Sequence, residues 1–443
     1  MKRILVLYSM LAGSVLVQAQ NYNALSLNEC IGMAMGNANT VKIAENDKLA
    51  SEQKLYEAKA QTYPELILSS MFTRVGQVSE FSIPMELGVE RSLKFGTNNR
   101  VNMDLKLQLP LFTWWRVSST IDLSEKGIEL SRNQLRKEEL QTINRLLTSF
   151  YEILFNKKIV ELNKLQTERA KEIYDITKIR YDNGQVSELD LMRSDLKYKN
   201  ILNQLSDANS NYHKSKINLA KEIGIESSAF DIEDKFGFDK INIDESNLEQ
   251  AILNENTNLK ALDIQMQMLP YQLSIAESGN KPNVFAFSGY NVNNGFNPMN
   301  PEKFYDNWNV GVQLSWKIFD GFATRHKSEQ IQIQSGTIDY QKNEIQKTLS
   351  SQFQQFIIQL KQAENNISIA EENLKLSKKV LSISEEQYKS GIASQLDLIN
   401  AEDNVSQSEL FIVQSIFSHI ITKINLSRIT EDYSWFGIRT NEK

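Results

Sequence analysis

Two short segments place a carboxylate where it could act on ions. Each reads Leu-Asp-Leu, with Asp190 in the first and Asp397 in the second. Asn400 follows Asp397 by three positions, so the two residues share one face if the segment is helical. An aspartate just after a turn often caps the following helix or is simply solvated. Spacing alone leaves open a third role, because carboxylates that line a passage attract cations and repel anions.

Residues suited to catalysis or metal binding are sparse and scattered. The three histidines, His213, His326 and His419, lie far apart and lack metal-ligand spacing. The sequence contains no glycine-rich nucleotide loop, nucleophile elbow or zinc-protease motif. Its 11 methionines are dispersed, as gap-filling core residues are. We therefore predict no enzymatic activity, no cofactor and no metal site.

The two Leu-Asp-Leu segments belong to a longer repeat. Residues 180–191 read RYDNGQVSELDL and residues 387–398 read QYKSGIASQLDL, with six identities at an offset of 207 positions. Pro64 and Pro282 open two further similar segments 218 positions apart, so the first copy holds about eleven extra residues between its strands. An internal two-fold repeat is therefore expected. We predict structural repeats at 20–232 and 240–430, followed by a C-terminal tail at 431–443.

The apolar pattern assigns the same elements to both halves. Residues 101–111 and 308–318 alternate between apolar and polar side chains, as strands with one apolar face do. Long stretches of helical periodicity follow, and at 1.5 Å per residue each first helix would run about 90–100 Å. Helices of that length have to pack along other long helices in a coiled-coil arrangement. The predicted elements are a helix at 25–62, β-hairpins at about 65–112 and 283–319, and helix pairs at about 116–223 and 321–428.

The N-terminus has the pattern of a secretory signal. Lys2 and Arg3 precede an apolar run, and Ala19 suits a signal peptidase, so we predict a signal peptide at 1–19. The alternative is a membrane anchor, but the run is shorter than the ~20 residues of a spanning helix. No later run of about eighteen apolar residues is found, so no later spanning helix is expected. Cys30, the only cysteine, is expected to be a small buried residue of the first helix.

The charge balance argues against one class of partner. The formal net charge is −6, and removal of Lys2 and Arg3 with the signal leaves 47 basic against 55 acidic side chains, or −8. A nucleic-acid backbone requires a basic face. We therefore predict no nucleic-acid partner.

The alternating strands need a cover for their apolar face. The helices that follow are too long to fold back over the sheet, so lipid is the remaining cover, and a lipid-exposed sheet has to close into a barrel. Four strands cannot close around a lumen alone, so several subunits have to contribute. Four tryptophans in or beside the strands fit an aromatic belt at a bilayer interface, although core packing also favours aromatic residues. The predicted lipid-facing residues are Val101, Met103, Leu105, Leu107, Val310, Val312 and Leu314; the belt residues are Trp114, Trp115, Trp308 and Trp316; and the residues facing the lumen or loops are Asn102, Asp104, Lys106, Gln313 and Ser315.

The order of these motifs resembles a known family. A strand ending in Leu-Pro-Leu-Phe at 109–112, followed by the two turns at 180–191 and 387–398, is similar to the TolC family of outer membrane efflux proteins. The resemblance covers about residues 25–430. It implies a mainly α-helical homotrimer whose membrane β-barrel has twelve strands, four from each subunit, and continues as a coiled-coil tunnel. It also implies a place in the outer membrane, an extension into the periplasm, and contact with a periplasmic adaptor (membrane fusion) protein and an inner-membrane pump.

The resemblance assigns roles to residues around both turns. In the family, two successive acidic positions on the returning helix line the entrance; Asp397 matches the first, and Asn400 stands at the second, so half of that charge is kept. The family also holds the entrance shut with a tyrosine, an arginine and an aspartate. Tyr388 and Asp190 match two of these, and Ala393 stands at the arginine position. The turn residues expected to meet the adaptor are Gly184, Val186, Ser187, Gly391, Ile392 and Ser394.

A second class of function is a secreted coiled-coil structural or adhesion protein. That class explains the long helices but not the duplicated alternating strands. Heat-resistant trimers and ion conductance in planar bilayers would distinguish a channel from a fibre. The sequence does not indicate whether the channel serves efflux or type I secretion, because a duct that receives substrate from a pump needs no selective pocket.

Overall fold

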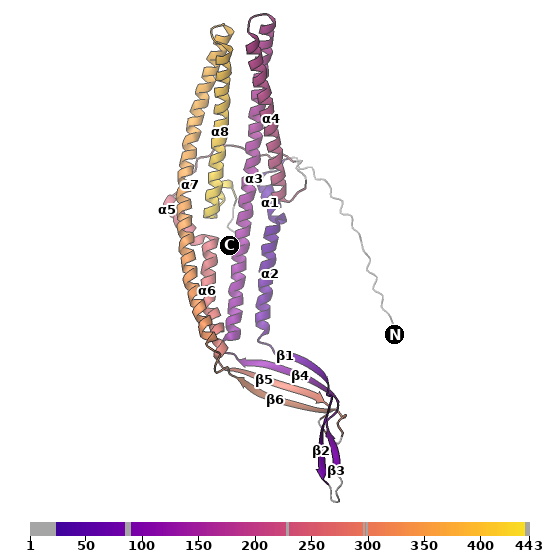
Figure 1. Ribbon diagram of the computed structural model, residues 1–443. Helices are drawn as coiled ribbons and strands as arrows, with labels where there is room; N and C mark the ends of the chain where they lie inside the picture. Colours follow the sequence, from indigo (N-terminus) through magenta and orange to yellow (C-terminus); the bar gives the residue numbers. More distant parts are fainter. Residues whose placement is uncertain (1–23, 85–89, 227–229, 296, 298–299, 439–443) are drawn as a thin grey trace.

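The computed structural model describes residues 24–84, 90–226, 230–295, 297 and 300–438. It shows an elongated molecule in which long helices stand on a small β-sheet (Figure 1). This mainly helical architecture with a strand layer confirms the predicted fold class. The predicted signal peptide at 1–19 lies outside the described residues.

Two long helical hairpins dominate the structure. The first consists of α3 (Arg116–Asp182) and α4 (Glu188–Ile223), and the second of α7 (Ala323–Lys389) and α8 (Gln395–Thr430). α3 and α7 each contain 67 residues, which is about 100 Å at 1.5 Å per residue. Every bound of the second hairpin lies 207 positions after its counterpart in the first, which is the offset of the sequence repeat. The duplicated sequence therefore folds into duplicated structure.

Shorter helices pack beside the part of each long helix that lies nearer the sheet (Figure 1). These helices are α1 (Leu27–Asn37), α2 (Asn39–Ala60), α5 (Glu245–Glu255) and α6 (Thr257–Glu277). The single helix expected over 25–62 is broken at Ala38, whose backbone is extended. At this break the Asn37 side chain donates to the Ile223 carbonyl at 3.0 Å. That bond satisfies one of the free carbonyls at the end of α4. Two short 3-10 helices, η1 (Ser278–Asn280) and η2 (Ser434–Phe436), complete the described helices.

The largest hydrophobic core lies where α1, α3, α4 and α8 meet. Phe150 of α3 and Leu219 of α4 are fully buried there. Tyr433, just after α8, is also buried, and its hydroxyl donates to the Leu140 carbonyl at 3.2 Å. Cys30 of α1 belongs to the same cluster, which confirms its predicted burial, and burial raises the pKa of its thiol to about 12. This core joins both hairpins at mid-height.

α8 differs from expectation, because its length and composition would allow it to cross a membrane. In the structure the apolar residues of its C-terminal part instead belong to the protein core. Ile420 and Ile424 contribute to the core described above, and Leu426 and Ile429 form a second cluster with Phe353 of α7. We therefore assign α8 to the helical bundle.

The sheet joins the two halves of the chain. Its strands are β1 (Glu65–Arg74), β4 (Asn99–Phe112), β5 (Asn283–Asn293) and β6 (Tyr305–Ser315). They are antiparallel neighbours in the order β1-β4-β5-β6. The central pair, β4 with β5, connects strands from different repeats. β1 and β6 are the two edges, and each pairs on one side only within the described chain.

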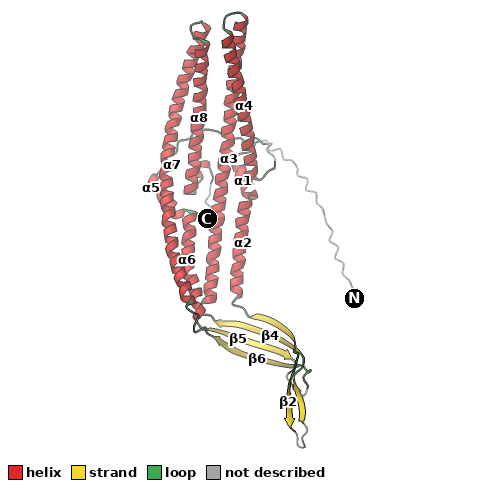
Figure 2. Ribbon diagram, viewed as in Figure 1, coloured by secondary structure: helices red, strands yellow, loops and turns green. Residues whose placement is uncertain are grey.

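The first strand segment is more elaborate than the predicted hairpin at about 65–112. β2 (Ser79–Pro84) and β3 (Glu90–Phe95) pair with each other in a separate two-stranded sheet. This sheet projects from the end of the main sheet and contains the extra residues of the first copy (Figure 2). The sequence pattern missed it because each strand spans only six positions, too few for a firm alternation.

Candidate functional site

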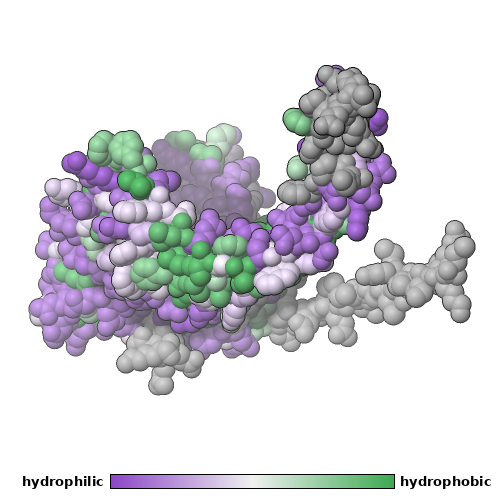
Figure 3. Space-filling model, turned by 90° about the horizontal axis from the view of Figure 1, so that it is seen from below, coloured by the Kyte–Doolittle hydropathy of each residue, from purple (hydrophilic) through white to green (hydrophobic). Residues whose placement is uncertain are grey.

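The cross-strand register gathers apolar residues on one face of the main sheet. Leu68, Leu105, Tyr290 and Trp308 are consecutive cross-strand partners through all four strands. Partners in such a row lie on the same face, and every second residue along each strand joins them. Leu66, Leu107 and Val310 belong to the neighbouring row. From the sheet end of the molecule, apolar side chains are seen to gather in one patch among polar ones (Figure 3).

All seven residues predicted to face lipid lie on this apolar face. Val101 is half-buried and the other six are exposed. The exposed fraction is 38% at Leu105 in β4 and 71% at Val310 in β6. Such fractions show that no other part of the described chain covers the face. The apolar face thus lacks the helical cover that a sheet in a water-soluble protein has.

The opposite face of the sheet is mainly polar. Asn102, Asp104 and Lys106 of β4 alternate with the apolar residues and therefore lie on it. The Asn291 side chain of β5 donates to the Asn102 side chain at 2.7 Å. Gln313 and Ser315 of β6 were also expected on this side, and the pairing of β6 with β5 places both on the polar face. The apolar exceptions on this face include Ile67, Met71, Pro110, Phe285 and Phe287.

Strained aromatic residues mark the junctions between sheet and helices. Trp114, Trp115 and Phe322 have φ of 47°, 58° and 67°, in the left-handed region that costs an L-residue ~1–2 kcal/mol. Trp115 and Phe322 precede α3 and α7 directly and lie at equivalent positions of the two repeats. The ring centroids of Phe112 and Trp114 are 5.2 Å apart. The strained turn therefore sets the direction of each long helix relative to the sheet.

The four predicted belt tryptophans divide between two levels of the sheet. Trp114, Trp115 and Trp316 lie at the helix end, where Trp316 Nε1 donates to the Asn280 carbonyl at 3.0 Å. Trp308 lies eight residues before Trp316 along the strand direction, or about 26 Å at 3.3 Å per residue. The apolar band of a membrane barrel is about 25 Å tall and has an aromatic girdle at each side. The distance between the two levels of tryptophan is therefore similar to the distance between two girdles. Tilt of the strands shortens this distance when it is measured across the membrane.

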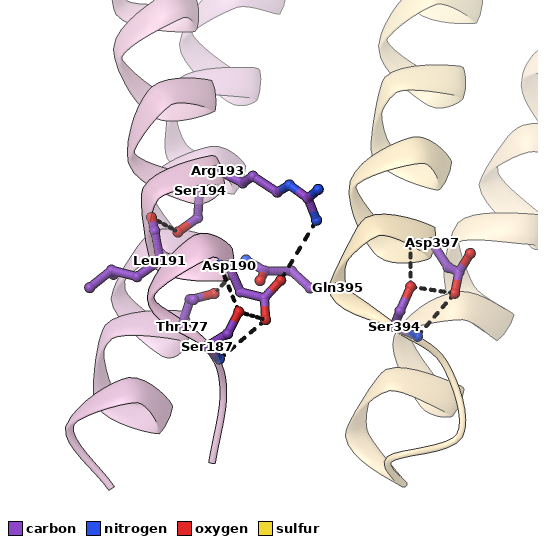
Figure 4. Close-up of polar contacts among 9 residues, drawn as sticks. All are labelled: Thr177, Ser187, Asp190, Leu191, Arg193, Ser194, Ser394, Gln395 and Asp397. Carbon is purple, nitrogen blue, oxygen red and sulfur yellow. Dashed lines mark hydrogen bonds and ion pairs between the residues drawn. The ribbon is translucent and has the colours of Figure 1, made fainter. Parts of the chain in front are cut away.

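The turns at the free ends of the two hairpins share one geometry. Gly184 and Gly391 have φ of +68° and +77°, which favour glycine. Ser187 begins α4 through a capping box: its hydroxyl donates to an Asp190 carboxylate oxygen at 2.7 Å and accepts from the Asp190 amide (Figure 4). Ser394 and Asp397 repeat this arrangement at the start of α8. Both helices are thus fixed at their first turn.

The two turns differ in the side chains that they expose. Ile392 is 78% exposed, and the equivalent position of the first turn holds Gln185, which is exposed but polar. Leu189 and Leu396, one turn further, are both exposed. The hairpin ends therefore carry uncovered apolar side chains, most prominently at the second turn.

The residues predicted to form the entrance are only partly brought together. Asp397 and Asn400 are both exposed on α8, and hydrogen bonds from Ser394 hold the pKa of the Asp397 carboxyl below its ordinary value. Within the described chain, the buried Tyr388 hydroxyl has no hydrogen-bond partner, so it makes no bond to Asp190. The Tyr388 ring instead lies under the Arg180 guanidinium, at 4.4 Å. Asp397 thus caps α8 and remains available as a negative charge.

A group that the sequence did not reveal connects the two hairpins near their free ends. Arg169 of α3 lies between two glutamates of α8: its Nη2 donates to Glu409 Oε2 at 2.9 Å, and its Nε lies 3.3 Å from Glu402 Oε2 without hydrogen-bond geometry. We call these three residues the Arg169 clasp. Gln395 of α8 also donates to Thr177 of α3 at 2.9 Å (Figure 4). In the sequence, the seven-residue spacing of Glu402 and Glu409 indicates that both lie on one face of a helix. It does not indicate that Arg169 faces them.

Carboxylates outnumber cations around the clasp. The side chains of Glu402 and Glu409 are 14% and 11% exposed, so their charges are largely shielded from water. Burial raises the pKa of Glu402, as do the nearby carboxylates of Glu385, Glu409 and Asp403, whereas Arg169 lowers it. An ion pair between Lys197 of α4 and Asp403 adds a second link between the hairpins. Arg169 is therefore the main counter-charge for two half-buried carboxylates.

Comparisons with known proteins agree with this geometry. The model of the outer membrane efflux protein family matches residues 30–224 and 248–430. Nodulation protein T of Rhizobium leguminosarum bv. trifolii is 18% identical over 367 residues, which cover 81% of this chain and 75% of that protein.

Solved structures show the same fold. The CmeC outer membrane channel of Campylobacter jejuni has a TM-score of 0.75 at 16% identity, covering 91% of this chain and 85% of that chain. The outer membrane protein VceC of Vibrio cholerae has a TM-score of 0.75 at 14% identity, covering 91% and 95%. The open-state MtrE channel of Neisseria gonorrhoeae has a TM-score of 0.73 at 13% identity, covering 91% and 88%. Because the family model matches both repeats over most of their length, this chain belongs to the outer membrane efflux protein family.

Proposed function

We propose that three copies of this chain form an exit duct that crosses the outer membrane and extends through the periplasm. The observation that carries the proposal is the uncovered apolar face of the four-stranded sheet, with β1 and β6 as open edges. Edges in lipid have to be paired, because no water is present to bond their peptide groups. Three copies supply twelve strands, enough to enclose a lumen lined by the polar face that carries Asp104 and Lys106.

The helical hairpins supply the periplasmic part of the duct. α3 and α7 run about 100 Å from the sheet, and the turns at 183–187 and 390–394 lie at their far ends. We propose that these turns contact a periplasmic adaptor protein, and that an inner-membrane pump drives substrate into the duct. Exposed Ile392, Leu189 and Leu396 support this role, because apolar residues at a protruding tip suit a protein contact. Efflux and secretion remain equally compatible with this geometry.

Cysteine labelling in native outer membranes tests the proposal. With buried Cys30 replaced by alanine, a cysteine at position 104 is expected to react with a membrane-impermeant maleimide, and one at position 105 to be protected. The reason is that Asp104 lies on the polar face and Leu105 on the face proposed to meet lipid. Both cysteines should react equally once the protein is unfolded, which controls for local reactivity.

Two outcomes would count against the duct. Reaction at 105 with protection at 104 would reverse the sheet. A soluble fibre without heat-resistant trimers or ion conductance in planar bilayers would favour a coiled-coil structural or adhesion protein instead.

We also propose that Asp397 contributes a ring of carboxylates to the periplasmic entrance, with Asn400 one helical turn further on. Asp397 is charged through the physiological range, because an aspartate is already ionised there and the hydrogen bonds from Ser394 lower its pKa further. Asp397→Asn is expected to lower the preference for cations over anions and to weaken block by multivalent cations added from the periplasmic side. Single-channel recordings in planar bilayers provide the measurement.

Ser394→Ala is the matched control, because it breaks the same capping box of α8 while keeping the Asp397 carboxylate. It separates loss of a helix cap from loss of pore charge. Unchanged selectivity and block in Asp397→Asn would remove Asp397 from the pore lining.

A further inference from the structure

A cavity of about 550 Å³ lies beside α8, at the level of α1 and far from both the sheet and the turns. Its walls come from the start of α1, the middle of α3, the segment that links the two repeats, α8 and the residues after α8. The volume lies within the range of small-molecule sites. No residue of the main sheet or of the turns at 183–187 and 390–394 lines this cavity.

The cavity lining contains separated charges of both signs. These are the carboxylates Glu233, Asp234 and Asp239 and the ammonium groups Lys235 and Lys423. Among the described residues, Lys423 has no carboxylate within 4.0 Å; its ammonium lies 4.8 Å from the Phe436 ring centroid. Burial lowers the pKa of Lys423, and Asp239 raises it, so the two groups sense each other without forming an ion pair. The half-buried ammonium of Lys423 therefore lacks a carboxylate partner, whereas the Asp239 carboxylate is exposed and free to pair with a ligand.

Aromatic side chains form the apolar part of the lining. Tyr151, Phe238, Trp435 and Phe436 all line the cavity. Tyr151 and Phe436 have ring centroids 5.7 Å apart, and Phe238 meets the His419 ring edge-on at 4.8 Å. Such a wall suits the flat side chain of an aromatic ligand.

A buried polar atom also lacks a partner at this cavity. His419 lines it, is 1% exposed, and its Nε2 has no hydrogen-bond partner in the described chain. Glu364 Oε1, at 4.0 Å from that nitrogen, is too distant for a hydrogen bond. Burial lowers the pKa of His419 to about 4, so the ring is neutral at pH 7 and can donate or accept one bond. A buried polar group without a partner is costly, and His419 Nε2 is such a group among the described lining residues.

We propose that this cavity binds a small aromatic zwitterion, such as a free aromatic amino acid or a short aromatic peptide. Its carboxylate pairs with Lys423, its ammonium pairs with Asp239, and its ring packs against Trp435 and Phe436. The proposal stands on the lining of the cavity alone and does not depend on the proposed duct.

Calorimetric titration of the full-length protein in detergent tests the proposal with four probes. Phenylalanine and the dipeptide Ala-Phe carry both charges, N-acetylphenylalanine lacks the ammonium, and phenylalanine amide lacks the carboxylate. We expect saturable binding of phenylalanine or Ala-Phe, and affinity at least about tenfold weaker for each singly charged analogue, because one charge-assisted pair is lost. Comparing phenylalanine with Ala-Phe distinguishes a free amino acid from a peptide.

Two variants assign the binding to this cavity. Asp239→Asn and Lys423→Gln are each expected to weaken phenylalanine or Ala-Phe binding about tenfold. Lys240→Gln is the matched control, because Lys240 is exposed beside Asp239 but does not line the cavity. Lys423 is half-buried, so Lys423→Gln could affect folding. Asp239 is exposed, and Asp239→Asn should therefore leave the fold intact and keep the test valid. Absence of binding up to about 10 mM, equal affinity for the singly charged analogues, or unchanged binding in Asp239→Asn would each overturn the proposal.

Discussion

Replacing Arg169 with alanine is expected to widen the proposed periplasmic entrance and raise the channel's conductance. The change removes the cation between Glu402 and Glu409, which are 14% and 11% exposed. The shielded carboxylates of Glu402 and Glu409 then lose their positive partner on α3. Separation of the hairpins is favoured, because it returns these carboxylates to water. Breaking a fully buried pair costs ~3–5 kcal/mol; because Arg169 is 28% exposed, we expect ~1.5 kcal/mol per subunit after allowance for screening. That value corresponds to about a tenfold shift toward separated hairpins.

Planar-bilayer conductance and leakage of a bulky hydrophilic antibiotic into cells provide the two measurements. Lys158→Ala is the matched control, because Lys158 forms an exposed pair with Glu161 on the same helix, α3. Gel migration of unheated samples checks that the oligomer is intact, which separates opening from unfolding. If Arg169→Ala forms intact oligomers with the conductance and leakage of Lys158→Ala, the clasp does not restrain the entrance.

Replacing Gly184 and Gly391 together with phenylalanine is expected to abolish export while the oligomer still assembles. Both glycines have positive φ, where a bulky residue is strained, and each would add a ring at the proposed adaptor contact. The space around both positions is open, since a Cβ there would meet no described atom within 4 Å. The fold should therefore survive, and the loss should appear in drug susceptibility or in the amount of secreted product.

Alanine at the same two positions separates backbone strain from bulk. The double alanine variant has the same positive-φ penalty but adds only a methyl group, so we expect partial export. Normal export by the double phenylalanine variant would exclude the turns as a docking surface. A defect of equal size in both variants would assign the effect to turn strain.

The elements with strong periodicity were predictable from the sequence. α3 and α7 follow from long apolar repeats that end at Gly184 and Gly391, where only glycine readily takes the left-handed turn. Two strands of the main sheet, β4 and β6, follow from strict alternation, because one face of each is apolar along most of its length. β1 and β5 alternate less cleanly, since Ser70 and Ser288 interrupt their apolar faces. The break at Ala38 was not predictable, because it depends on Asn37 reaching the end of α4, 186 positions away.

The candidate entrance shows the limit of a sequence reading more sharply. Tyr388 and Asp190 were expected to act together, but Arg180 of α3 covers the Tyr388 ring instead. The Arg169 clasp was missed for the same reason: its partners are 233 and 240 positions away in the sequence. Contacts of this kind depend on how two helices are rotated and shifted against each other, and apolar periodicity does not fix that register at the level of single polar side chains.

The pairing of β4 with β5 also has a consequence for the order of folding. Each helical hairpin closes a turn of five residues, whereas the central strand pair brings together Asn102 and Asn293, 191 positions apart. By loop-closure entropy the strand pairing costs roughly 3 kcal/mol more to initiate. Local contacts form faster than distant ones, so the long helices can form while the strands are still unpaired. The sheet, which we propose to enter the membrane, is therefore expected to assemble last, after the helices can already hold the two repeats side by side.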